Sequence, residues 1–355
     1  MKNTPRKAKT QRYKKINVFI LGVLFFVYLT LFAFGCDESS KTPVDVFNVG
    51  DIYNPKVQSG DPRTTAFQII QWGLADDNPA VRVSAIEVVA TTRQIRLMPK
   101  IQRLLMDRLV PVRFAAALAV GDLEYSLAAK SVMPLLKDQD ENVIVAAAYS
   151  MGKLGFPEYF EVLHKALDSD NQTVRANAAL LLGKSGDKSA LPLLYQTLRR
   201  KDSHDKVVYQ SAESIAMLGD EQIYPKLWTM LISAYADVRL MGIRAMGALK
   251  TAKARDALVR MLDDDVIEVR LAAAEQLGTF RDTTGEPEVL KVFKKNLTAG
   301  LNEQATVRIY VLTAMAIGRI GTPSLVEFLP RLMQHESKFV RIAAARAVFQ
   351  CSMKR

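Results

Sequence analysis

Cysteine is nearly absent from this sequence, with two in 355 residues, Cys36 and Cys351. So few cysteines exclude a disulfide framework as the source of stability. Alternation of apolar and polar residues, the pattern of β-strands, does not compete with helical spacing anywhere in the chain. Hydrophobic residues make up 49% of the chain and charged residues 24%, so the composition excludes general disorder and allows a large core.

Histidines and catalytic motifs are equally scarce. The three histidines, His164, His204 and His335, lie far apart in sequence, and none has a partner at the spacing of a metal site. No phosphate-binding loop or nucleophile motif is present. We therefore expect no catalytic residue, no metal and no cofactor, and we expect that the chain is not an enzyme.

Acidic residues are missing from the first 35 positions, where seven Lys and Arg residues come before residue 16. These seven account for most of the net charge of +11 and leave +4 for the rest of the chain. Because the remainder is only mildly basic, we expect no nucleic-acid partner.

An uncharged apolar run of twenty residues, Ile16 to Gly35, follows the basic segment and ends at Cys36. A cationic flank, an apolar run and a cysteine followed by Asp-Glu-Ser-Ser together resemble a bacterial lipoprotein signal. The resemblance implies that residues 1–35 are a signal peptide and that Cys36 is diacylated and becomes the mature N-terminus. The run is also long enough to cross a bilayer uncut, so a transmembrane anchor is the alternative.

Both alternatives place the basic flank in the cytoplasm and the rest of the chain beyond the membrane. We therefore expect a bacterial cell-envelope protein that is anchored to a membrane and faces the periplasmic side. Residues 36–61 have no helical period and contain Pro and Gly, which predicts a flexible tether.

One motif is repeated along the remainder of the chain and is clearest in Val174 to Gly186. It starts with Val or Ile, followed in most copies by Arg, and successive copies are 31, 31, 31, 34, 30, 31, 40 and 31 residues apart. The copies begin at Val81, Val112, Val143, Val174, Val208, Val238, Val269, Ile309 and Val340. A near-constant period of this length predicts a solenoid, in which each unit buries its apolar face against its neighbours.

Each copy has the spacing of a helix. If the residue after the Val or Ile is position 0, apolar or small residues recur at −1, +3, +4, +7 and +8, on one helical face. Ala at +3 and +4 and Gly at +8 let two helices approach closely. A second helix, often with a proline at its start, precedes each copy. Asp107, Asp138 and Asp264 lie six residues before position 0, where we expect a carboxylate to cap the following helix.

The pattern V-R-x-x-A-A-x-x-L-G, preceded by a proline-containing helix, resembles the HEAT repeat in the short bacterial form also found in phycobilisome lyase proteins. The resemblance implies an all-α fold, an α-solenoid of about nine two-helix repeats over residues 62–355. It says little about function, because this repeat serves scaffolds, transport factors and a few enzymes.

A candidate binding surface lies on the second helix of each unit, where positions +2, +5 and +9 point away from the packed side. Position +5 places Leu118, Tyr149 and Leu180 on one line, and Lys153 and Lys184 border it at +9. Exposed apolar strips with a polar border are typical of protein-binding sites. The alternative is that solenoid curvature buries much of this strip.

We therefore expect a membrane-tethered scaffold that binds a partner protein on its solenoid surface. An accessory subunit that positions a cell-envelope enzyme complex is one alternative, and a HEAT-type lyase or ligand-binding enzyme is another. An inner groove with convergent polar groups would favour the latter. The last unit has Phe349 at +8 with Ile342 nearby, which predicts either an exposed apolar end face or an inward plug.

Overall fold

The computed structural model describes residues 60–353, and over this range the chain is helical and contains no strand. The predicted all-α solenoid is confirmed. No helix within residues 60–353 combines the length and the apolar character that crossing a membrane requires. The apolar run, Cys36 and nearly all of the predicted tether lie outside the described residues.

The helices pair into nine units over residues 60–353, each with an outer helix or short helical segment followed by an inner helix. The outer helices are α2 (Pro62–Gly73), α4 (Met98–Leu104), α6 (Ala129–Val132), α8 (Phe160–Ala166), α10 (Leu191–Arg199), α12 (Tyr224–Leu231), α14 (Ala252–Arg260), α16 (Glu286–Lys294), α18 (Pro323–Val326) and α19 (Leu329–Met333). The inner helices are α3 (Pro79–Thr91), α5 (Val110–Asp122), α7 (Glu141–Lys153), α9 (Gln172–Ser185), α11 (Asp205–Met217), α13 (Ala236–Leu249), α15 (Ile267–Thr279), α17 (Glu303–Ile320) and α20 (Lys338–Met353).

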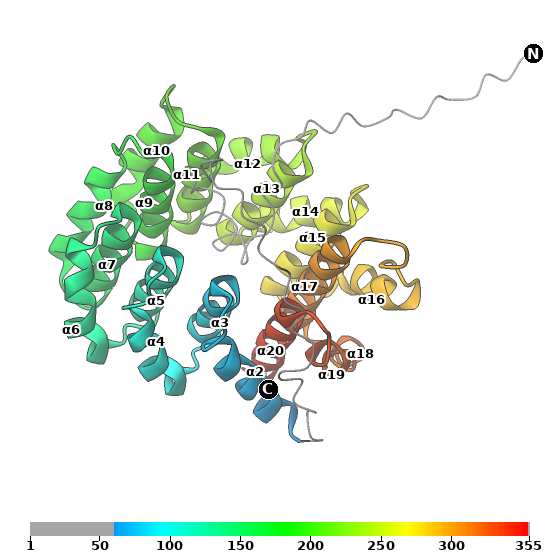
Figure 1. The fold of residues 1–355 in the computed structure, drawn as a ribbon. Helices are drawn as coiled ribbons and strands as arrows, with labels where there is room; N and C mark the ends of the chain where they lie inside the picture. Colours follow the sequence, from blue (N-terminus) through cyan, green and yellow to red (C-terminus); the bar gives the residue numbers. More distant parts are fainter. Residues whose placement is uncertain (1–59, 354–355) are drawn as a thin grey trace, which may run out of the picture.

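The array curls until its two ends meet, so that α2 and α3 pack against α20 (Figure 1). A Cβ added to Gly73 of α2 would lie 3.3 Å from Cδ1 of Ile342 on α20. Ile342 and Phe349 are both buried. The expectation of an exposed apolar end face is therefore wrong, because the first unit covers the last and closes the solenoid into a ring.

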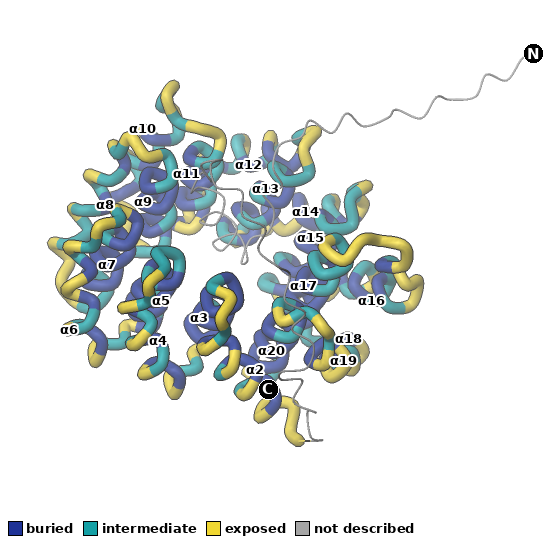
Figure 2. Tube along the Cα trace, in the orientation of Figure 1, coloured by how far each residue is buried: buried dark blue, intermediate teal, exposed yellow. Residues whose placement is uncertain are grey.

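Small residues set the distance between neighbouring inner helices. A Cβ added to Gly183 on α9 would lie 2.7 Å from Cβ and 2.8 Å from Cα of Ser214 on α11. Gly121 on α5 meets Ser150 on α7 in the same way, with its added Cβ at 2.9 Å from the Ser150 Cα. These contacts explain why Gly recurs at +8, and Figure 2 shows the inner helices as the most deeply buried layer.

A ladder of arginines and aspartates links successive units. Arg113 donates from Nε and Nη2 to the Asp138 carboxylate of the next unit at 2.8 and 2.9 Å, and from Nη1 to the carbonyl oxygen of Asp107 in its own turn. Arg82 pairs with Asp107 in the same manner, and Arg239 with Asp264. The carboxylates accept the N–H of the residue two positions on, which precedes the helix. The three aspartates that were predicted to cap the helices therefore stabilise the turn before each helix and bind the arginine of the preceding unit.

The ladder also spans the closure of the ring. Asp76, six residues before position 0 of the first unit, accepts from Nζ of Lys338 at the start of α20, at 2.7 Å. We call the contact between α2 and α20, with this ion pair, the seam. The first and last units are therefore joined by an ion pair and by apolar packing, as neighbouring units are elsewhere.

Candidate functional site

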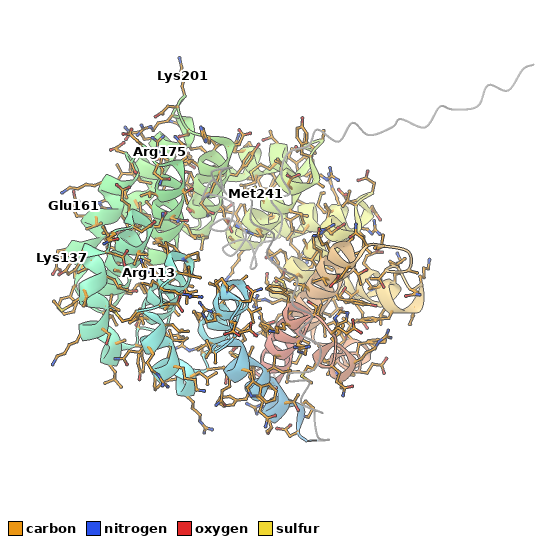
Figure 3. All side chains as sticks on the ribbon, viewed as in Figure 1. Arg113, Lys137, Glu161, Arg175, Lys201 and Met241 are labelled. Carbon is orange, nitrogen blue, oxygen red and sulfur yellow. The ribbon has the colours of Figure 1, made fainter. Side chains whose placement is uncertain are left out.

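Ring closure brings the +5 side chains of separate inner helices toward one centre. A cavity of about 190 Å³ lies there, lined by residues of α3, α5, α9, α11 and α13. Its apolar wall includes Val83, Ile86, Ala90, Leu118 and Leu180, and we call it the central cavity. By contrast, Figure 3 shows Lys137, Glu161 and Lys201 pointing away from the ring on its outer surface.

The residues of the predicted binding strip have different surroundings in the structure. Leu118 and Leu180 line the central cavity, as does Lys184, whose Nζ lies 3.0 Å from Oδ2 of Asp122. Lys153 pairs with Glu124 at 3.0 Å.

Tyr149 does not lie exposed on this strip. It is 1% exposed, and its hydroxyl donates to Oδ1 of Asp122 at 2.8 Å. Burial, together with the negative charge of Asp122, raises the pKa of the Tyr149 hydroxyl far above its usual range. The expectation that Tyr149 is an exposed anchor is wrong, because packing of α7 against α5 places its ring at Gly121. A protein-binding role for the strip stays a prediction.

Charged side chains that the sequence did not single out complete the centre. Position +5 carries Glu87 on α3, Arg244 on α13, Glu275 on α15 and Arg346 on α20. Arg244 is paired with Glu213 of α11, with Nε 3.1 Å from Oε1. The repeat pattern places these residues at equivalent positions, but only the closed ring brings them together.

Glu87 is partly buried, and its side chain borders the central cavity. Burial raises the pKa of its carboxyl from 4.5 to about 8, against the opposing influence of Arg346, Lys184 and Arg244. The carboxyl is therefore mostly protonated at neutral pH and can donate a hydrogen bond. The central cavity thus combines apolar walls and one neutral carboxyl with two cations, Lys184 and Arg244, that are each paired with an acid of the lining.

A second feature lies on the edge of the ring, in the turns between units. Each of these turns contains a residue with positive φ, such as Arg93, Glu124 and Gly155. In three consecutive turns a large apolar side chain follows it: Ile95, Leu127 and Phe156, exposed by 43%, 75% and 44%. Because the turns are equivalent, these side chains follow one edge of the array, which we call the turn rim.

The comparison with protein families agrees with the fold that the structure shows. The model of HEAT repeats matches residues 68–151, 129–216, 160–239 and 224–306, which is well over half of the chain.

Among curated proteins, the chain is 28% identical over 120 residues to phycocyanobilin lyase subunit alpha of Nostoc sp.. The match covers 33% of this chain and 44% of that relative, so the chain spans less than half of its length. The expectation that the chain is not an enzyme is therefore contradicted, since this distant similarity points to a lyase-related protein.

Solved structures with similar folds include the complex of CpcE and CpcF of phycocyanin lyase from Nostoc sp. It is 18% identical with a TM-score of 0.41, over 71% of this chain and 94% of that one. Human deoxyhypusine hydroxylase in complex with glycerol is 17% identical with a TM-score of 0.37, over 75% of this chain and 99% of that one.

Proposed function

Because this chain belongs to the HEAT-repeat family, we propose that it is a membrane-tethered scaffold that binds a partner protein on the extracytoplasmic side. The observation that carries the proposal is the turn rim, where three consecutive units each expose a large apolar side chain in the equivalent turn, one to three residues after the residue with positive φ. Such exposed apolar surface is typical of protein-binding sites. The central cavity, at about 190 Å³, has the volume of a small molecule and not of a folded partner.

The surroundings of the turn rim fit a protein partner. Arg93 and Arg96 flank Ile95, and Glu158 follows Phe156, and all three charged side chains are exposed. An apolar centre within a polar border of mixed charge is the usual composition of a protein interface. The rim therefore suits a partner surface that offers apolar side chains to Leu127 and Phe156.

Cross-linking tests this site directly. A photo-reactive amino acid at position 127 of the full chain, expressed in its native membranes, should give a discrete adduct that Phe156→Asp abolishes. Met133→Asp is the matched control, because Met133 is 52% exposed and lies outside the turn rim. An adduct that survives Phe156→Asp, or that Met133→Asp removes equally, contradicts the rim as the binding site.

The membrane tether is supported by the sequence alone, through the basic flank, the apolar run and Cys36. Labelled palmitate should enter the wild-type chain and not Cys36→Ser. Stable attachment needs more than one acyl chain, as expected of a diacylated cysteine. Equal labelling of both chains, or labelling of neither, would leave the transmembrane anchor as the mode of attachment.

A second candidate function, a lyase-related activity, is favoured by the similarity to the phycocyanobilin lyase subunit. Its test is spectroscopic, because a bilin changes its visible absorption when a protein holds it. Mixing the purified chain with phycocyanobilin should shift the absorption maximum, and an unchanged spectrum contradicts this second function.

A further inference from the structure

Arg346 differs from the other deeply buried arginines of the described chain. Arg82 and Arg239 each donate to an aspartate of the ladder, and Arg175 donates to Asp202 in the loop before α11. Arg346 is 4% exposed, and its Nε and Nη1 are buried without a hydrogen-bond partner among residues 60–353. A buried guanidinium without a partner is costly, so its position indicates an anion that completes it.

The space beside Arg346 has the size of a small head group. Arg346 borders a pocket of about 30 Å³ with Ser84, Glu87 and Met315. This is room for about two water molecules or for one carboxylate. Glu87 also lines the central cavity, so the small pocket and the larger apolar chamber meet at this residue.

The other charges at the centre determine which anion fits. Lys184 and Arg244 are already paired with Asp122 and Glu213. Glu275 on α15 adds a further carboxylate to the centre, where it acts on Glu87 and on Arg319 of α17. Lys184 and Arg244 offset Asp122 and Glu213, and Glu275 acts on Arg319, so one carboxylate matches the remaining charge of Arg346, whereas a dianion such as phosphate exceeds it. Glu87, protonated near neutral pH, can donate to such a carboxylate.

We propose that the ring binds a small aliphatic monocarboxylate, with its carboxylate at Arg346 and its hydrocarbon chain in the central cavity. The chain of the ligand lies among Ile86, Leu118 and Leu180, and the central cavity of about 190 Å³ limits it to a short or medium length. The site exists only in the closed ring, since Arg346 belongs to the last unit and Glu87 to the first. It depends on neither the turn rim nor a lyase activity.

The experiment is a thermal-shift and calorimetric titration of the full chain with octanoate, with octanol as the uncharged probe. Octanoate should bind and raise the melting temperature, because a ligand that binds only the folded state stabilises it. Octanol should bind at least tenfold more weakly. No response to octanoate, or equal responses to both probes, would overturn the proposal.

Variants separate the site from general stability. Arg346→Met should leave the unliganded ring at least as stable, since it removes an unpartnered buried charge, and should weaken octanoate binding at least tenfold. Arg331→Ala, on the exposed side of α19, is the matched control and should bind octanoate as the wild type does. Unchanged octanoate binding in Arg346→Met would overturn the assignment. Partner capture at position 127 should persist in Arg346→Met, so the two proposals fail independently.

The pH dependence of binding gives a further check. Octanoate affinity should fall as pH rises through about 8, when Glu87 ionises and repels the bound carboxylate. The groups that act on Glu87 are Arg346 of α20, Lys184 of α9, Arg244 of α13 and Glu275 of α15. Glu87→Gln should bind with little change across this range, and a pH dependence equal to that of the wild type would contradict a role for Glu87.

Discussion

Buried side chains between neighbouring inner helices carry much of the specificity of this ring, and Tyr149 shows how. Its ring packs between α7 and α5, and its hydroxyl donates to Asp122, which also pairs with Lys184 of α9. One tyrosine thus links three consecutive units. The same carboxylate fixes the cation that borders the central cavity.

Tyr149→Ala should lower the free energy of unfolding by about 3–5 kcal/mol, as for other buried aromatic residues. Tyr149→Phe removes only the hydrogen bond to Asp122 and should cost about 1 kcal/mol. Urea denaturation measures both changes. Leu127→Ala, at an exposed position, is the control and should stay within about 0.5 kcal/mol of the wild type. A loss in Tyr149→Ala no larger than in this control would contradict the buried position.

Glu87 should make stability depend on pH. Its pKa is raised from 4.5 to about 8 in the folded chain, so between these values the folded state keeps a proton that the unfolded state has lost. Stability therefore falls as pH rises from about 4.5 to about 8, by at most about 1.4 kcal/mol per pH unit for one proton. Denaturation at a series of pH values should show Glu87→Gln gaining on the wild type across this range. A constant difference would contradict the shifted pKa.

The sequence predicted that position +5 points away from the packed side, and Leu118 and Leu180 do border the central cavity. The sequence could not distinguish these two leucines from Tyr149, because all three residues occupy position +5 of the repeat, although Tyr149 is buried. The difference lies in neighbours from other units: Tyr149 meets Gly121, which leaves room for its ring. A glycine at +8 of the preceding unit does not by itself predict this burial, because Gly152 occupies that position before Leu180, which still borders the central cavity.

At the scale of helices, the distance between neighbouring inner helices depends on glycines at the points where the helices meet. Gly183 allows α9 and α11 to approach until an added Cβ would lie 2.8 Å from the Ser214 Cα. A backbone atom cannot move aside as a flexible side chain can. A larger residue at position 183 could therefore be accommodated only if one of the two helices moved as a whole.

Gly183→Ala should destabilise the chain by about 1–2 kcal/mol despite the better helix propensity of Ala, which alone would gain about 1 kcal/mol. The reason is the shift that α11 must make. Thermal denaturation measures the loss, and Ser214→Gly in the same chain should recover part of it by removing the Ser214 Cβ. A stabilised Gly183→Ala variant would show that the two helices are not in close contact.

Helix pairs and their order could be predicted, because each unit carries its own period and most units carry an Arg at position 0. Closure could not, since it depends on a small rotation per unit that accumulates over the array. One residue does signal it. Asp76 occupies the ladder position of the first unit, which no other unit precedes within residues 60–353, and its partner is Lys338 of the last.

At the scale of the whole molecule, the seam decides whether the array is a ring or an open arc. Its apolar part is Ile342 against Gly73, and its polar part is Lys338 with Asp76. Ends of open repeat arrays fray because they lack a neighbour on one side. In this chain the first and last units are neighbours, so both sides of each are covered.

Ile342→Asp should open the ring, because it places a carboxylate in the buried seam without a partner. Small-angle X-ray scattering should report a larger radius of gyration, and hydrogen exchange should rise in α2 and α20 while α7 and α9 stay protected. Lys338→Ala is the control, since this partly exposed ion pair contributes at most about 1 kcal/mol. An unchanged radius and unchanged exchange in Ile342→Asp would contradict a closed ring that depends on the seam.

The seam also constrains how this chain can change over evolutionary time. An open solenoid can lengthen or shorten by duplicating or deleting a repeat, because each repeat contacts only its neighbours. A closed ring has no such freedom: one repeat more or fewer would require every joint to change its angle, or the ends to separate. Copy number is therefore fixed by geometry, and this chain can diversify its units only by substitution and by insertion within loops.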